Sequence, residues 1–162
     1  MSRLDSMIRR LEAQRACLAA ATEKVELLPG LFLELGLGNG RTYDHLRELA
    51  PEREIFVFER NPAAHPACTP TGEFLVEGDF TKTLAQQRTQ LEGRAVLAHC
   101  DIGSGVRERD IELASAISSD LDALLCDGAI ILSDQEFDRA NWRPVPTPKI
   151  VEPGRYFMYL KI

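Results

Sequence analysis

The chain alternates short apolar runs with longer amphipathic stretches along almost its whole length. The apolar runs predict buried strands at 31–35, 55–58, 74–76, 95–100, 129–132 and 156–162. Apolar residues at helical spacing predict helices at about 3–26, 42–49, 83–91 and 107–125, the last of which is expected to be capped by Gly128. Strands that alternate with helices in this way build a mostly parallel sheet with helices on both faces, so we expect an α/β fold.

The first predicted strand runs into a glycine-rich turn. Residues 31–41 read LFLELGLGNGR, which puts Gly36, Gly38 and Gly40 at alternate positions directly before a predicted helix. Glycines let the backbone turn tightly, and the helix that follows offers free N–H groups to a ligand above the turn. The dinucleotide fingerprint G-x-G-x-x-G needs a third glycine where this chain has Arg41. The spacing therefore predicts a nucleotide-type pocket and argues against an enzyme that uses NAD.

Carboxylates lie at or near the ends of the first four predicted strands, and they are Glu34, Glu59, Asp79 and Asp101. In open α/β sheets, ligands bind beyond these strand ends. A carboxylate at Glu59 can accept hydrogen bonds from both hydroxyls of a ribose. Asp79 can accept a hydrogen bond from the exocyclic amine of adenine, and Phe80 can pack on the ring. An ordinary surface charge is the alternative for Glu59, and a turn role is the alternative for Asp79.

These residues make the chain resemble the class I methyltransferases, which use S-adenosylmethionine. The resemblance rests on the ELGLGNG sequence at 34–40, on Glu59 after the second strand and on the Gly-Asp-Phe sequence at 78–80. It covers roughly residues 30–133 and departs from the family where Asp-Gly-Ala at 127–129 replaces the usual Pro-Gly-Gly. The resemblance implies a three-layer Rossmann-like methyltransferase fold. Its sheet would be mostly parallel, twisted and seven-stranded, with an antiparallel strand near the C-terminus.

The resemblance also implies that S-adenosyl-L-methionine is the cofactor and indicates where it binds. By analogy with the family, the backbone of the glycine turn approaches the methionine end of the cofactor. Glu59 would then hold the ribose, and Asp79 would hold the adenine. The full set of candidate cofactor-binding residues is Glu34, Gly36, Gly38, Asn39, Gly40, Glu59, Arg60, Asp79, Phe80 and Asp101.

Asp101 is also the candidate catalytic residue, because it sits where the family places its substrate-facing loop. It can orient an amine or a hydroxyl, or act as a base. The alternatives are capping of the helix near Arg107 and indirect binding of the cofactor. His99, alone on an apolar strand, is expected to be a core group. Asp134 and Glu136 are interpreted as loop acids, with a cation or substrate site as the alternative.

Two familiar patterns are absent from the sequence. The Asn/Asp-Pro-Pro-aromatic sequence of many amino methyltransferases does not occur, so nothing favours a nitrogen of adenine, glutamine or cytosine as the acceptor. The cysteines and histidines match no zinc pattern, and we expect no metal.

The length of 162 residues predicts a single domain. Its parts are an N-terminal helical segment (1–28), a cofactor-binding core (30–133) and an extended tail with a closing strand (134–162). The tail leaves little room for a helix, so we do not expect the family's standard connection of the sixth strand. The N-terminal helix can pack on the domain's own sheet, close over the pocket as a lid, or form a dimer seam. The tail is a second candidate for a homo-oligomer contact.

The composition narrows the choice of partners. A formal net charge of −6 argues against nucleic acid, which is bound through clustered Lys and Arg. Four cysteines without a C-x-x-C pair are typical of reduced thiols. We find no signal sequence or membrane span in the sequence and expect a cytoplasmic protein.

A methyltransferase that acts on a small molecule by in-line transfer is the function that these observations favour. The core of the predicted fold carries no added recognition domain. A non-catalytic module that binds S-adenosylmethionine or S-adenosylhomocysteine is the alternative, because no catalytic motif stands out.

Overall fold

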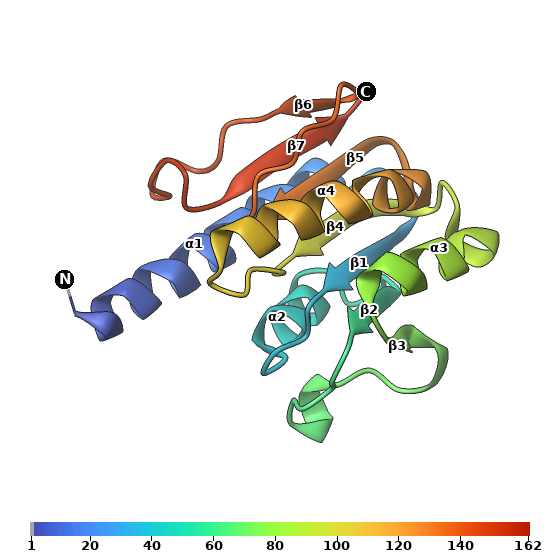
Figure 1. Ribbon diagram of the computed structural model, residues 1–162, viewed down its shortest axis with the longest axis horizontal. Helices are drawn as coiled ribbons and strands as arrows, with labels where there is room; N and C mark the ends of the chain where they lie inside the picture. The colour runs from blue at the N-terminus through green and yellow to red at the C-terminus, as the bar shows by residue number, and fades with distance from the viewer. Residues whose placement is uncertain (1) are drawn as a thin grey trace.

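Seven strands form one sheet in the middle of the computed structural model, which describes residues 2–162 (Figure 1). The strands are β1 (Leu31–Leu35), β2 (Ile55–Glu59), β3 (Leu75–Glu77), β4 (Ala95–Cys100), β5 (Leu125–Ser133), β6 (Trp142–Pro144) and β7 (Phe157–Lys161). Their order across the sheet is β3-β2-β1-β4-β5-β7-β6. Strands β1 to β5 pair in parallel, while β7 runs antiparallel to both β5 and β6. This sheet confirms the expected fold class, including the antiparallel strand near the C-terminus.

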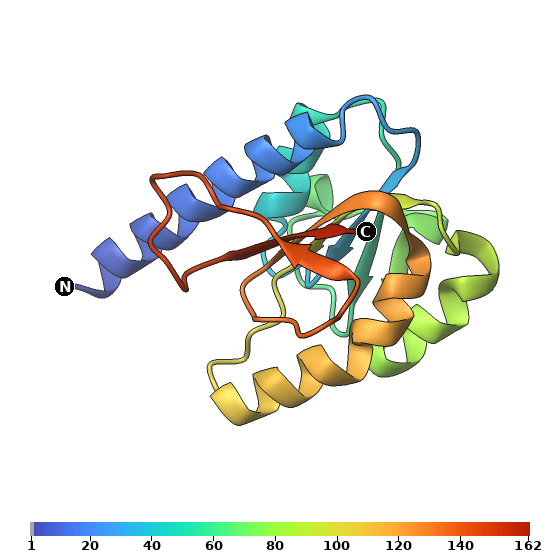
Figure 2. The same cartoon turned by 90° about the horizontal axis from the view of Figure 1, so that it is seen from above.

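Helices cover both faces of the sheet, which explains why its strands read as continuous apolar runs. They are α1 (Arg3–Lys24), α2 (Arg41–Leu49), α3 (Phe80–Leu91) and α4 (Arg107–Leu124), and two short 3₁₀ turns lie at Pro66–Cys68 and Gly72–Phe74. Helices α1 and α2 pack on one face over a core that includes Phe32 and Val57. Helices α3 and α4 pack on the opposite face over Leu33 and Phe58 (Figure 2). Successive residues of one strand thus serve opposite cores.

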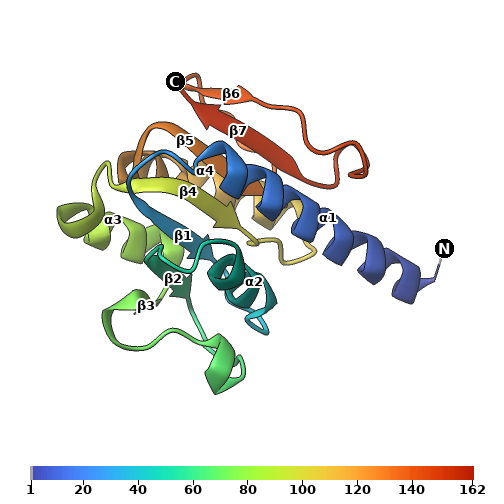
Figure 3. The ribbon, with the colours of Figure 1, turned by 180° about the vertical axis from the view of Figure 1, so that it is seen from behind.

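Only the second half of α1 packs against the sheet. Its buried residues are Ala13, Gln14, Cys17, Leu18 and Ala21. The first half extends past the body of the domain (Figure 3). Its four large apolar side chains are between 37% and 68% exposed, and they are Leu4, Met7, Ile8 and Leu11. Among residues 2–162, no helix has the length and apolar character that a membrane span requires.

The start of β5 differs from the sequence prediction. We expected Gly128 to end the preceding helix and the strand to begin at residue 129, but the strand begins at Leu125. Ala95 pairs with Leu125 while Leu97 pairs with Ile130, so the segment between these pairs is out of register. Gly128 has a φ of +84°. The glycine therefore permits a bulge inside the strand and does not cap the helix.

The tail returns to the sheet and docks on α4. Residues 134–141 link β5 to β6 without a helix, as the short tail led us to expect. Trp142 is buried, and its ring lies 5.2 Å from that of Phe137 and 6.1 Å from that of Tyr159. Its indole N–H donates a hydrogen bond of 2.7 Å to Asp122. The last two strands are thus held to the body by a buried aromatic cluster.

Candidate functional site

The glycine turn joins β1 to α2 and fits tightly against two neighbouring loops. Gly36 has a φ of +90°, and a Cβ there would come 2.2 Å from the carbonyl oxygen of Asp101. Gly40 is the N-cap of α2 with a φ of +79°, and a Cβ there would come 2.4 Å from the carbonyl oxygen of Cys68. Both positions need glycine, because the backbone is left-handed and no room remains for a side chain.

Glu59 ends β2 and holds the glycine turn from the neighbouring strand. Its Oε2 accepts hydrogen bonds from the backbone N–H groups of Leu37 at 2.8 Å and Gly38 at 3.3 Å. Its Oε1 accepts a hydrogen bond from the N–H of Asn61 at 3.1 Å. An ionised carboxylate has about four acceptor positions, so these bonds fix its orientation and leave capacity for a further donor.

A first cavity of about 320 Å³ opens between the glycine turn and the loops after β2, β3 and β4. Small-molecule sites typically measure about 300–1,000 Å³, so this volume suits a ligand of that class. Five of the predicted cofactor-binding residues line it, and they are Gly36, Glu59, Arg60, Phe80 and Asp101. The other lining residues are Asn61, Gly78, Ile102, Gly103, Ser104 and Leu113. Gly38, Asn39 and Gly40 belong to the turn but are not part of this lining.

Asp79 lies next to the first cavity as the N-cap of α3. Its side chain accepts hydrogen bonds from the N–H and the hydroxyl of Thr81 at 2.9 and 2.6 Å, and it pairs with Arg60 at 2.9 Å. The hydrogen bonds from Thr81 lower the pKa of Asp79, and the bond from the hydroxyl has the largest effect. This cap explains why α3 begins at Phe80, three residues before the predicted start.

Glu34 lies behind the glycine turn and has no exposed surface. One of its oxygens accepts a hydrogen bond from the hydroxyl of Thr42, and the other lies 2.8 Å from Nδ1 of His99. A side chain that is sealed from the first cavity has no surface to offer a ligand there. The structure therefore places Glu34 behind the turn, where it supports the turn and the start of α2.

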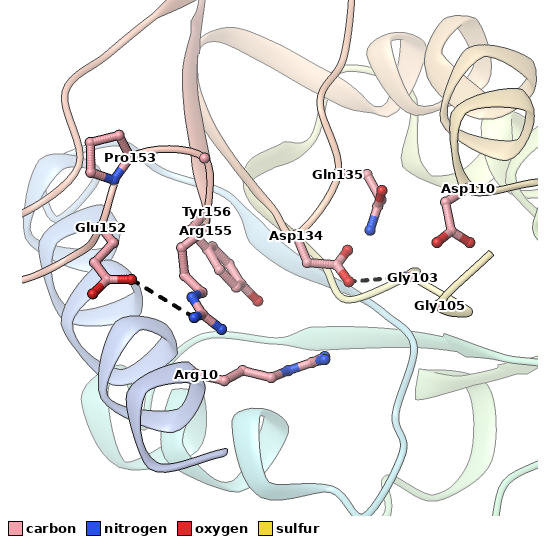
Figure 4. A pocket seen from close by; sticks show the side chains of 11 residues that line it. Arg10, Gly103, Gly105, Asp110, Asp134, Gln135, Glu152, Pro153, Arg155 and Tyr156 are labelled. Carbon is pink, nitrogen blue, oxygen red and sulfur yellow. Dashed lines mark hydrogen bonds and ion pairs between the residues drawn. The ribbon is translucent and has the colours of Figure 1, made fainter. Parts of the chain in front are cut away.

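A second cavity of about 490 Å³ adjoins the first, and Gly103 lines both (Figure 4). Its residues come from α1, from the loops after β4 and β5, from the start of α4 and from the segment before β7. They are Arg10, Gly103, Gly105, Asp110, Asp134, Gln135, Glu152, Pro153, Gly154, Arg155 and Tyr156. From the sequence, we linked only Asp134 to a ligand, as an alternative. Arg10 and Arg155 come from opposite ends of the chain, and no motif spacing connects them to the strand ends.

Helix α1 holds the carboxylate of Asp101, which follows β4 and lines the first cavity. Nη2 of Arg10 lies 2.5 Å from Oδ1 of Asp101, and the Gln14 amide donates a hydrogen bond of 3.1 Å to Oδ2. The same amide nitrogen donates to the hydroxyl of Tyr156 at 3.1 Å. The helix that the sequence presented as a packing element, a lid or a dimer seam thus supplies two side chains to the candidate site.

Buried polar side chains continue from Tyr156 to the glycine turn. The hydroxyl of Tyr156 lies 2.8 Å from Nε2 of His99, whose other ring nitrogen contacts Glu34. Burial alone lowers the pKa of His99, but the adjacent Glu34 carboxylate outweighs this effect and raises it. His99 is fully buried with a partner at each ring nitrogen, which agrees with the core role we expected.

Asp134 follows β5 and faces the loop after β4. Its two carboxylate oxygens accept hydrogen bonds from the backbone N–H groups of Ile102 and Gly103, each at 3.0 Å. Burial, together with the negative charge of Asp101, raises the pKa of Asp134. Asp134 therefore takes up a proton more readily than an exposed aspartate.

The fold and the site define a Rossmann-like protein whose strand ends carry a glycine turn, an acid on the neighbouring strand and two adjoining cavities. A family described as S-adenosyl-L-methionine methyltransferase matches residues 1–161. The crystal structure of an S-adenosyl-L-methionine methyltransferase from Silicibacter pomeroyi DSS-3 is 39% identical, with a TM-score of 0.94 over 100% of this chain and 99% of that one. The chain belongs to this family. It is an S-adenosyl-L-methionine-dependent methyltransferase, and S-adenosyl-L-methionine is its cofactor.

More distant structures share the fold alone. The 1,6-didemethyltoxoflavin-N1-methyltransferase of Burkholderia thailandensis is 14% identical, with a TM-score of 0.63 over 92% of this chain and 78% of that one. A 16S rRNA (adenine(1408)-N(1))-methyltransferase from Catenulisporales acidiphilia is 13% identical, with a TM-score of 0.54 over 92% of this chain and 90% of that one. Comparison with curated protein sequences gives no match.

Proposed function

We propose that this methyltransferase acts on a small molecule that binds in the second cavity. The observation that carries the proposal is the shared residue Gly103, because it places the acceptor space directly beside the first cavity. The volume of about 490 Å³ suits a small molecule. The Burkholderia structure holds a small acceptor, 1,6-didemethyltoxoflavin, whereas the Catenulisporales enzyme is named for 16S rRNA. The net charge of −6 favours the small molecule here.

The first cavity is our proposed cofactor site. S-adenosyl-L-methionine, when bound, supplies a methyl group on a positively charged sulfur. In this proposal, the turn at 36–40 lies along the methionine end, and Glu59 accepts hydrogen bonds from the ribose with its remaining capacity. Phe80 packs on the adenine, and Asp79 accepts a hydrogen bond from its amine. Glu34 acts from behind the turn, without contact to the cofactor.

Asp101 is our proposed catalytic residue, and its role is to orient the acceptor at the junction of the two cavities or to take its proton. Methyl transfer is an in-line displacement that depends on alignment and on exclusion of water. Arg10 and Gln14 support this role, because they bind both oxygens of the carboxylate and keep it from turning.

Cofactor binding and methyl transfer are tested separately. Calorimetry with S-adenosylmethionine and S-adenosylhomocysteine measures binding, and transfer of a tritiated methyl group to a cell extract measures activity. We expect label in the small-molecule fraction, and expect Asp101→Asn to bind cofactor but transfer much more slowly. Asp127→Asn, an exposed residue in β5, is the matched control. Label in RNA alone would contradict the proposal, and tight binding without any transfer would favour the non-catalytic module.

We also propose a homo-oligomer that uses the exposed first half of α1. Its four apolar side chains face solvent over two helical turns, an arrangement that favours contact with another apolar surface. Light scattering should give a mass above that of one chain, and Ile8→Glu should reduce it to one chain. An unchanged mass in Ile8→Glu would direct attention to the tail, the second candidate for this contact.

We also propose that the chain folds as a single domain and functions in the cytoplasm. Cys17, Cys68, Cys100 and Cys126 are all free thiols, which suits a reducing compartment. Fractionation of cells that produce the tagged protein should recover it with cytoplasmic markers. A single cooperative unfolding transition should accompany this result.

A further inference from the structure

The second cavity has walls of opposite charge. Figure 4 shows the guanidinium groups of Arg10 and Arg155 directed into the cavity, with the carboxylate of Asp134 on the side where β5 ends. We propose that the methyl acceptor is a zwitterion, a small molecule with an anionic group at one end and an amine at the other. The amine receives the methyl group. This inference rests on the proposed function, because it takes the second cavity as the acceptor site.

Arg155 has free donor groups for the anionic end of such a molecule. Its acidic partner is Glu152 at 3.9 Å, but Glu152 makes a closer contact of 2.7 Å with Arg9. Arg10 binds Asp101 through one nitrogen at 2.5 Å, and a guanidinium carries five N–H donors in all. Guanidinium groups bind carboxylates and phosphates through paired, charge-assisted hydrogen bonds. The two arginines therefore form the anion-binding end of the cavity.

Asp134 lies at the other end of the cavity, where it can bind the amine of such a molecule. Its oxygens are bound by backbone N–H groups, and no Lys or Arg lies within 4.0 Å of it in the part of the chain that the structure describes. One of those N–H groups belongs to Gly103, which lines both cavities. An amine that binds Asp134 is thereby held at the entrance to the first cavity, next to the place where the methyl group is supplied.

A molecule with a single charge matches only half of this cavity. A simple amine would pair with Asp134 but would bring a second positive charge towards Arg10 and Arg155. A simple anion would pair with the arginines but would approach the three carboxylates that line the cavity, Asp110, Asp134 and Glu152. A zwitterion satisfies both ends, and the buried ring of Tyr156 lines the space between them.

Methyl transfer to this amine needs one proton transfer, and Asp134 accepts that proton, which leaves Asp101 to orient the acceptor. The ammonium form gives a proton to the Asp134 carboxylate, which frees the lone pair of the nitrogen. The lone pair then forms the N–C bond, and the C–S bond breaks with its electron pair left on sulfur. The products are a methylated ammonium and a neutral thioether. The raised pKa of Asp134 favours this proton transfer, because the carboxylate accepts a proton more readily than an exposed aspartate.

The test uses three probes that share a four-carbon chain: 4-aminobutyrate, butyrate and butylamine. Each is titrated into the protein with saturating S-adenosylhomocysteine, and binding is followed by NMR. We expect 4-aminobutyrate to bind at least about tenfold more tightly than either singly charged probe, since it gains one more charge-assisted contact. Equal binding of butyrate or butylamine would overturn the proposal, and so would the absence of binding by all three.

Two variants test which residue binds each charged end of 4-aminobutyrate. Arg155→Leu should reduce the affinity for 4-aminobutyrate to that for butylamine, and Asp134→Asn should reduce it to that for butyrate. Arg143→Leu and Asp127→Asn are matched controls, because both residues are exposed outside the cavity and should leave all three affinities unchanged.

The charge of the natural product gives an independent readout. Tritiated product from a cell extract should be retained by a cation exchanger at low pH and by an anion exchanger at high pH. A product retained by only one exchanger would contradict the zwitterion. Binding of 4-aminobutyrate without transfer of label to any molecule would contradict the proposed function and with it the methylation of the amine, and only the assignment of the two charged ends of the cavity would stand.

Discussion

His99 and Glu34 form a hydrogen bond of 2.8 Å in a place where neither side chain has any exposed surface. The bond joins the carboxyl end of β4 to the strand that enters the glycine turn. Burial of a charged group is costly unless its partner remains, so this pair is a point where one substitution has a large effect.

Glu34→Leu should lower the free energy of unfolding by about 3–5 kcal/mol, because it leaves His99 without its partner in the core. Urea unfolding monitored by circular dichroism measures the change. The double variant Glu34→Leu with His99→Leu should recover part of the loss, since no ionisable group then remains buried without its partner. If the double variant is less stable by the full sum of the two single losses, the pair is not coupled.

The same pair predicts how stability depends on pH. His99 has a folded pKa above its usual value of 6.5, so it binds a proton more tightly in the folded protein than in the unfolded chain. Its contribution is fully present below about pH 6.5 and is lost as the pH rises through the folded pKa. The stability difference between the natural protein and His99→Gln should therefore shrink in urea unfolding as the pH rises above about 6.5.

Glu59→Ala should weaken binding of S-adenosylhomocysteine by about 1.5–3 kcal/mol, the value of hydrogen bonds to a charged group. It removes the proposed ribose contact and also frees the N–H groups of Leu37 and Gly38. Isothermal calorimetry measures the affinity, and Glu77→Ala at the exposed end of β3 is the control. An unchanged affinity in a folded Glu59→Ala protein would refute the ribose assignment.

Two glycines of the turn should differ in their tolerance of alanine. Gly36→Ala places a Cβ 2.2 Å from a backbone oxygen, whereas a Cβ at Gly38 meets nothing within 4 Å. Gly38→Ala should lower the free energy of unfolding by only about 1–2 kcal/mol, the strain of a left-handed backbone. Gly36→Ala should lower it further and should also displace the loop that carries Asp101. Thermal unfolding and calorimetry with S-adenosylhomocysteine compare the two, and equal effects would contradict the packing described here.

Features that depend on residues close together in the sequence were predicted best. The apolar runs of β1 and β4 gave their boundaries, because strands buried on both faces show no polar alternation. The glycine turn and Glu59 were recognisable because a single strand–turn–helix unit and the next strand contain them. Gly128 was misassigned, since a glycine after a helical pattern looks the same whether it caps a helix or permits a bulge.

The sequence did not predict features that depend on contacts between distant segments. Arg10 and Gln14 reach Asp101 only because α1 crosses the strand ends, and a helical pattern does not say which side chains will face a site. Arg155 and Tyr156 lie in the segment before β7, whose path is set by the antiparallel return of the tail. Glu34 looked like a cofactor ligand because its neighbours in sequence form the turn, yet its side chain points into the core.

Gly103 lies between the two cavities, which are built from different parts of the chain. One part, the glycine turn with Glu59, is encoded within 34–59 and in our proposal serves the cofactor. The other part is assembled from the first and the last segments of the chain, together with the loops after β4 and β5. We therefore expect substitutions near either terminus to alter which molecule is methylated more than they alter binding of the cofactor. Acceptor preference in this family should vary with the ends of the chain.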